Sequence, residues 1–135
     1  MKTNPQEITA LLERVFPQIT GRYSITSLSL HNAEIVYHMG SENLRPGGTI
    51  SGPSLFGAAD LAFYLATMTY IGPQAMAVTA NANIHFLRKP APGDIRAVGR
   101  VLKPGRSLSV GDVLLYSVGD DRPVAQASLS YAIPR

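Results

Sequence analysis

The 135-residue sequence has no cysteine and no tryptophan, and only 16% of its residues are charged. Without cysteine the chain can form no disulfide bond, and it offers no thiolate as a nucleophile or metal ligand. The net charge is only +3 and the basic residues are scattered, so we expect no nucleic-acid partner. An apolar share of 45% is typical of a globular chain. We therefore expect one domain over residues 1–135.

Features of membrane targeting are also scarce. Residues 1–16 include acidic side chains and lack a continuous apolar core, which argues against a signal peptide. The most apolar stretch, residues 53–71, carries Asp60 and is flanked by strand-like segments, so we do not expect it to span a bilayer. These observations predict a soluble, cytoplasmic protein without a membrane partner.

Charge is scarcest in the middle of the chain. Asp60 is the only charged residue between Arg45 and Arg88 when histidine is counted as neutral. Residues 53–71 predict a helix that is apolar almost all round, and such a helix is usually buried. A carboxylate inside a buried helix costs free energy unless it finds a partner. Asp60 is therefore either a structural residue near a gap or a helix end, or a functional group.

The loop before this helix favours the functional interpretation. Pro53 suits the first helical position, which places Gly52 at the N-cap with Ser51 beside it. The start of a helix presents free N–H groups and a partial positive charge, which suit a developing oxyanion. Asp60 follows about two turns later, roughly 10–12 Å along the axis. We expect a carboxylate and an oxyanion site to flank one substrate if a partner subunit or a strand closes the gap.

The remaining sequence predicts a short helix and a set of strands. Residues 4–16 form an amphipathic pattern with Asn4 as N-cap and an apolar stripe of Ile8, Leu11, Leu12 and Val15. Strand patterns cover residues 22–30, 33–39, 75–87, 95–102, 106–118 and 124–133. In 75–87 we expect the even residues from Met76 to Phe86 to pack on the helix, while the odd residues line a subunit contact or a wet cleft. The predicted fold class is α+β, an antiparallel sheet of about six strands around one long helix, with the short helix outside.

This architecture resembles the hotdog fold, and two motifs resemble the PaaI-type acyl-CoA thioesterases. The first is G-x4-G-x7-D from Gly47 to Asp60, and the second is the segment 77–113 with its FLRKPAPGD turn. The resemblance covers roughly residues 40–133. It implies that Asp60 is the catalytic base or nucleophile and that the Gly52 N–H polarises the thioester carbonyl. It also implies that Thr79 helps to orient water, together with Ser51.

The sequence departs from the family pattern at two positions. The family's His-Gly-Gly is Ser51-Gly52-Pro53 here, and an asparagine six residues before that histidine is Arg45. The further substrate-binding residues that we expect, including the contacts of the coenzyme A phosphates, are Arg45, Pro53, Asn81, Arg88, Lys89 and Arg106. The resemblance implies no metal and no cofactor other than the coenzyme A of the substrate. It implies a homodimer, with a tetramer of two dimers as a further arrangement.

The sequence predicts an acyl-CoA thioesterase that releases a free acid and coenzyme A, and two other functions stay open. A non-catalytic hotdog module that binds acyl-CoA or another acyl ligand is favoured by Ser51 and Arg45. A hydratase or dehydratase would pair Asp60 with a histidine a few residues on, and residues 61–65 contain none. His85 suits a structural or exposed role, because no second ligand lies at metal spacing. The length of the acyl group is left undetermined.

Overall fold

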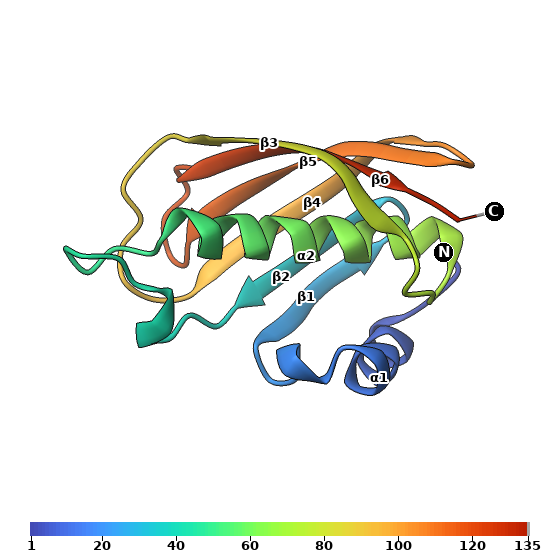
Figure 1. The fold of residues 1–135 in the computed structure, drawn as a ribbon, viewed down its shortest axis with the longest axis horizontal. Helices are drawn as coiled ribbons and strands as arrows, with labels where there is room; N and C mark the ends of the chain where they lie inside the picture. Colours follow the sequence, from blue (N-terminus) through green and yellow to red (C-terminus); the bar gives the residue numbers. More distant parts are fainter. Residues whose placement is uncertain (135) are drawn as a thin grey trace.

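The long helix α2 (Gly52–Ile71) lies along one face of a six-stranded antiparallel sheet in the computed structural model, which describes residues 1–134 (Figure 1). The strands follow the spatial order β1-β2-β4-β5-β6-β3. Their bounds are Tyr23–Ser29, Asn32–Tyr37, Val78–Phe86, Ile95–Pro104, Leu108–Ser117 and Ala125–Ala132 for β1 to β6. The predicted α+β architecture is confirmed, with β1 and β3 as the two edge strands.

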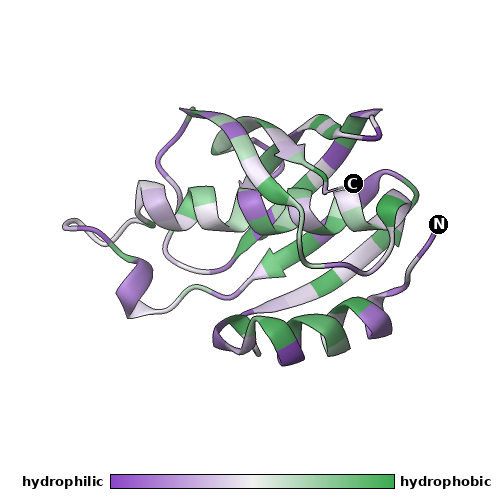
Figure 2. Cartoon of the chain, turned by 45° about the vertical axis from the view of Figure 1, so that its right-hand side comes forward, coloured by the Kyte–Doolittle hydropathy of each residue, from purple (hydrophilic) through white to green (hydrophobic). Residues whose placement is uncertain are grey.

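The N-terminal helix α1 (Pro5–Val15) begins where its capping signal predicts. The Asn4 side chain accepts a hydrogen bond from the Glu7 N–H at 2.9 Å, which satisfies one free donor of the first turn. Figure 2 shows hydrophobic and hydrophilic residues alternating along α1, as its amphipathic pattern predicts. The inner residues Ile8, Leu11 and Leu12 are buried, but Val15 is 48% exposed, so its predicted place in the stripe is wrong. Val15 is the last helical residue, where the helix already leaves the core.

The core lies between α2 and the inner face of the sheet. Phe63 is fully buried at its centre, and so are Ile35 of β2, Ile95 of β4 and Leu115 of β5. The helix is long and apolar enough to cross a membrane by length and composition alone, but most of its side chains are buried inside the fold. Burial on nearly every side explains its lack of a polar face. Two short 3₁₀ helices, η1 (Pro17–Ile19) and η2 (Ser41–Asn43), precede β1 and the loop to α2.

Strand β3 differs from its predicted pattern because of a β-bulge. Thr79 pairs with Tyr131, but Asn81 pairs with Ser130, so β3 holds one extra residue at this point. After the bulge the even residues lie on the helix side as predicted. Before the bulge the odd residues lie on the helix side, because one extra residue reverses the alternation of faces. The predicted inward placement of Met76 and Val78 is therefore wrong, and these side chains are 70% and 59% exposed.

Candidate functional site

The start of α2 has its cap one residue earlier than predicted. Ser51 is the N-cap, and its Oγ accepts a hydrogen bond from the Ser54 N–H at 3.3 Å. Gly52 is then the first helical residue, which corrects its predicted N-cap position and moves Pro53 to the second. A serine hydroxyl can accept this hydrogen bond and glycine has no side chain to do so, which explains the shift. Within residues 1–134 the Gly52 N–H donates to no protein acceptor. It remains available at the positive end of the helix.

Asp60 lies in the middle of α2 and is only partly buried. Two hydroxyl groups donate to the same carboxylate oxygen, Oδ1. The first is Oη of Tyr131 at 2.6 Å, and the second is Oγ1 of Thr79 at 2.8 Å. Within residues 1–134 the charge of Asp60 is thus met by two hydrogen bonds and no cation, which leaves the carboxylate able to act on a further ligand.

Tyr131 is the functional residue that the sequence interpretation missed. Its side chain is 3% exposed, and its Oη also lies 2.9 Å from the backbone carbonyl oxygen of Asp60. Burial, and then the nearby Asp60 charge, raise the pKa of this phenol well above its ordinary value. A tyrosine on the inward face of a strand usually has a partner for its hydroxyl, and this signal could have found it. Tyr131 follows Ala125, Ala127 and Leu129 on that face of β6.

A cleft of about 560 Å³ opens beside Asp60. Its walls come from the end of α1, from α2, from the connection into β3 and from β6. Apart from Asp60, the lining residues in the described part of the chain carry no charge. They are Val15, Phe16, Tyr64, Ala75, Met76, Ala77, Val78, Thr79 and Tyr131. A cleft of this volume is large enough for a small organic group.

A second cleft of about 460 Å³ opens at the start of α2. It brings Gly52 together with three of the predicted substrate-binding cations, Arg45, Arg88 and Lys89. The ring of Phe86 lies on the side of Gly52 where a side chain would stand, since a Cβ on Gly52 would lie 3.2 Å from Cζ of that ring. This cleft therefore joins a free backbone N–H to a cluster of positive charge.

The remaining predicted site residues lie apart from these clefts. Arg106 lies in the turn between β4 and β5. The next strand residue, Leu108, pairs with Ala132, and Ala132 also pairs with Val78, so this turn is near the start of β3. Arg88 and Lys89 follow the other end of β3. Within one chain the structure therefore does not bring Arg106 together with them. Asn81 is exposed on β3, and Pro53 is exposed in the first turn of α2.

A serine, a histidine and an aspartate also line up at the ends of β1, β2 and β4. The Ser24 Oγ lies 2.9 Å from Nε2 of His38, whose Nδ1 lies 3.0 Å from Oδ2 of Asp94. His38 and Asp94 line neither of the two clefts. The Met39 N–H also donates to Asp94, so the cluster fixes the chain that leaves β2 against the start of β4.

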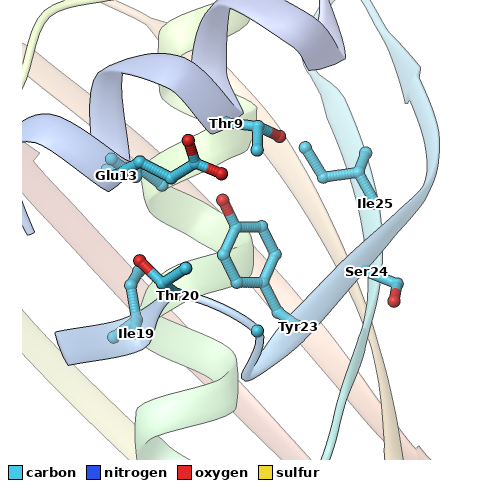
Figure 3. A pocket seen from close by; sticks show the side chains of 9 residues that line it. Thr9, Glu13, Ile19, Thr20, Tyr23, Ser24 and Ile25 are labelled. Carbon is cyan, nitrogen blue, oxygen red and sulfur yellow. The ribbon is translucent and has the colours of Figure 1, made fainter. Parts of the chain in front are cut away.

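A smaller cavity of about 130 Å³ lies between α1 and β1. Figure 3 shows the hydroxyl of Tyr23 pointing toward Thr9 and Glu13 there. Burial raises the pKa of the Tyr23 phenol. This cavity holds none of the predicted site residues. Among residues 1–134, no group of three or more His, Cys, Asp or Glu side chains could hold a metal ion.

Comparison with known proteins identifies the family. The sequence profile of the Thioesterase superfamily matches residues 47–124, which include Gly52, Asp60 and Thr79. A crystal structure provisionally described as a thioesterase, from Silicibacter sp. TM1040, is 44% identical. It covers 98% of this chain and 92% of its own, with a TM-score of 0.89. The chain therefore belongs to the Thioesterase superfamily.

A curated protein from Thermoplasma volcanium, provisionally named an esterase, is 32% identical over 82 residues. The match covers 61% of this chain, and the chain spans 61% of that relative's length. Two more distant structures share the fold. The PaaI protein of the phenylacetic acid degradation operon of E. coli is 19% identical, covers 98% of this chain and 97% of its own, and has a TM-score of 0.80. The smu.793 protein of Streptococcus mutans, bound to acetyl CoA, is 21% identical, covers 83% and 88%, and has a TM-score of 0.73. The predicted hotdog thioesterase resemblance is confirmed.

Proposed function

We propose that the protein is an acyl-CoA thioesterase, with Asp60 as the base or nucleophile and the Gly52 N–H as the oxyanion donor. The observation that carries this proposal is the Asp60 carboxylate, held by two hydroxyls at an open, otherwise uncharged cleft. Superfamily membership supports hydrolysis of a thioester. Asp60 and Gly52 are the residues whose chemistry this reaction needs.

The reaction has two routes from this carboxylate. Asp60 removes a proton from water as the water attacks the thioester carbonyl, or it attacks the carbonyl itself and forms an anhydride that water then opens. In both routes the carbonyl oxygen gains negative charge, which the Gly52 N–H and the helix N-terminus stabilise. The carbon–sulfur bond breaks, the coenzyme A sulfur takes up a proton, and a free acid leaves.

Both groups act on one substrate only if two chains combine. Asp60 lies eight residues after Gly52, about 12 Å along the helix axis, and the two residues open into different clefts. We propose a twofold homodimer in which Asp60 of one chain faces Gly52 of the other. The edge strand β3, with Val78 and Phe86 more than half exposed and Met76 exposed just before it, supports an interface there.

The two clefts suit the two parts of an acyl-CoA. The Gly52 cleft holds Arg45, Arg88 and Lys89, whose positive charges suit the coenzyme A phosphates. The acetyl CoA bound to the Streptococcus mutans structure supports a ligand of this class. Asp60 contributes a negative charge to its cleft, and the other described lining residues are uncharged, so we propose that the acyl group there is neutral, because a second carboxylate would be repelled by Asp60.

One different function is favoured by particular residues. A module that binds acyl-CoA without turnover would explain why serine and arginine stand at Ser51 and Arg45, where the family pattern has histidine and asparagine. Ser51 acts as the helix N-cap, so this substitution also has a structural reason. The two functions differ in whether bound acyl-CoA is hydrolysed.

The decisive experiment measures thiol release from a panel of acyl-CoAs, with Asp60→Asn beside the wild type. The panel includes acetyl-, octanoyl- and phenylacetyl-CoA, and the matched pair hexanoyl- and adipoyl-CoA, which differ by one terminal carboxylate. We expect the wild type to turn over neutral substrates, to prefer hexanoyl- to adipoyl-CoA, and to lose activity in Asp60→Asn. No turnover despite tight acyl-CoA binding would replace the enzyme by the binding module. Full activity in a folded Asp60→Asn would exclude the proposed mechanism.

A further inference from the structure

We propose that Tyr131 is the positioning residue of Asp60, and that Tyr131 and Thr79 together make Oδ2 the carboxylate oxygen that acts on the substrate. This inference rests on the proposed thioesterase function and adds to it the atom that reacts and the residue that orients it.

The two hydroxyl donors select one oxygen. Tyr131 and Thr79 approach Oδ1 of Asp60 at 2.6 and 2.8 Å, from neighbouring strands β6 and β3. Within residues 1–134, Oδ2 receives no hydrogen bond from the protein. A half-turn of the carboxylate only swaps two equivalent oxygens, so the same arrangement is restored. Any smaller rotation would break the hydrogen bonds from Tyr131 and Thr79. The pair of donors therefore fixes the plane of the carboxylate and leaves Oδ2 for water or for the carbonyl carbon.

Tyr131 restrains the carboxylate more firmly than Thr79 does. The Tyr131 ring packs edge-on against Phe63, with centroids 5.4 Å apart, and its side chain is almost fully buried. Thr79 lies on the exposed edge strand β3. Because β6 is flanked by β5 and β3, Tyr131 has little freedom to move.

Tyr131 also remains a donor. Burial and the Asp60 charge raise the pKa of its phenol, so the hydroxyl keeps its proton wherever the protein is folded near neutral pH. The phenol has one proton and two acceptors nearby, Oδ1 of Asp60 at 2.6 Å and the Asp60 carbonyl at 2.9 Å. The shorter contact to the charged oxygen takes the proton, since hydrogen bonds to an ionised acceptor are shorter and stronger.

The test replaces this hydroxyl while keeping the ring. Tyr131→Phe retains the packing on Phe63 and removes only the donor to Oδ1. The matched control is Tyr70→Phe, on the same helix as Asp60, where the lost hydroxyl bonds the Gly105 carbonyl at 2.9 Å. We expect Tyr131→Phe to lower kcat about 10- to 100-fold with KM within about twofold, because misplacement of a reacting group acts on the chemical step. Tyr70→Phe should leave both parameters near wild type.

A stability cycle separates failure of this inference from failure of the proposed function. Urea midpoints are measured for wild type, Asp60→Asn, Tyr131→Phe and the double variant, which requires no turnover. We expect Tyr131→Phe to lower the urea midpoint by a different amount in Asp60→Asn than in the wild type, because the two residues interact. Additive midpoints, or a folded Tyr131→Phe with wild-type kcat, would overturn the inference. A wild type inactive on the whole panel would remove the proposed function, and with it the reactive role of Oδ2, even where the cycle shows coupling.

Discussion

Gly111 of β5 lies directly against the ring of Phe63 at the centre of the core. A Cβ on Gly111 would lie 2.6 Å from Cε1 of Phe63 and 2.0 Å from the carbonyl oxygen of Arg100. Both distances are far below van der Waals contact, and the second involves backbone that cannot turn away. The close approach of α2 to the sheet therefore depends on the missing side chain at this position.

Gly111→Ala should destabilise the fold strongly. We expect the free energy of unfolding to fall by about 3 kcal/mol or more, since overpacking a core and displacing backbone have this cost. The control is Gly57→Ala on α2, where a Cβ meets no atom within 4 Å and should stabilise the helix by roughly 0.5–1 kcal/mol. Urea unfolding of both variants makes the comparison. A Gly111→Ala protein as stable as wild type would contradict the packing.

The oxyanion donor can be tested by removing one N–H. Gly52→Pro and Gly52→Ala both add a Cβ against Phe86 at the same pre-proline position, but only proline lacks the N–H. We expect Gly52→Ala to keep most of its kcat and Gly52→Pro to lose a further 10²- to 10³-fold, the usual effect of one oxyanion donor. Thiol release from the best substrate measures both. Equal activity in the two variants would show that this N–H does not act on the carbonyl.

Mixing two inactive variants tests whether the site is shared between chains. Asp60→Asn and Gly52→Pro are purified, unfolded together and refolded as an equal mixture. If Asp60 of one chain serves Gly52 of the other, half of the dimers are mixed and each has one intact site, so about a quarter of wild-type activity returns. If both residues of a site come from one chain, no mixture has an intact site. Absence of recovered activity, despite mixed dimers by mass spectrometry, would contradict the shared site.

The cationic cleft should act on substrate affinity. Arg88→Ala and Lys89→Ala should each raise KM for acyl-CoA about three- to tenfold and leave kcat little changed, because in the proposed function these side chains bind the phosphates and not the reacting carbonyl. The effect should shrink at high salt, where exposed charges are screened. The control is Arg14→Ala on the outer helix α1, which also removes one positive charge but lies outside the cationic cleft. A similar KM increase in Arg14→Ala would indicate a general charge effect.

Asp94 should make stability depend on pH in the acid range. The hydrogen bond with His38 lowers the pKa of this carboxyl below 3.8, burial opposes the shift, and the Met39 N–H adds to it. A carboxyl with a lowered pKa in the folded state stabilises the fold above its unfolded pKa, and this contribution is lost as pH falls through the folded pKa. We expect the free energy of unfolding to decrease below about pH 4, and to decrease less steeply in Asp94→Asn. Unfolding by urea at several pH values measures this slope, and an unchanged slope in the variant would contradict the assignment.

Most of the fold could be predicted from local patterns. The apolar run of residues 53–71 and the alternating strands determine a buried helix on an antiparallel sheet, because each pattern has its own period. The prediction of Asn4 as N-cap is confirmed, because this cap depends only on residues within three positions of each other in the sequence. The helix start at Ser51 was placed one residue late, since Pro53 satisfies the first and the second helical position almost equally well.

The candidate site was predicted only in part, because its contacts are not local. Asp60 was found from its isolation within an apolar helix, and Thr79 from the family resemblance. Tyr131 is 71 residues from Asp60, and only the pairing of β6 with β3 brings it beside Thr79. The bulge in β3 could not be predicted either, because apolar and polar residues alternate without a break through Ala80, and only the register with β6 shows that it is the extra residue.

The extra residue in β3 also has a consequence for sequence variation. A deletion of Ala80 would remove the bulge and restore simple alternation, with Thr79 still opposite Tyr131 and Asn81 still opposite Ser130. Loss of this single codon would therefore leave Thr79 as the side chain that meets the carboxylate, although the chain would be one residue shorter. Alignments of related chains that place the gap one position away would assign the wrong residue to Asp60.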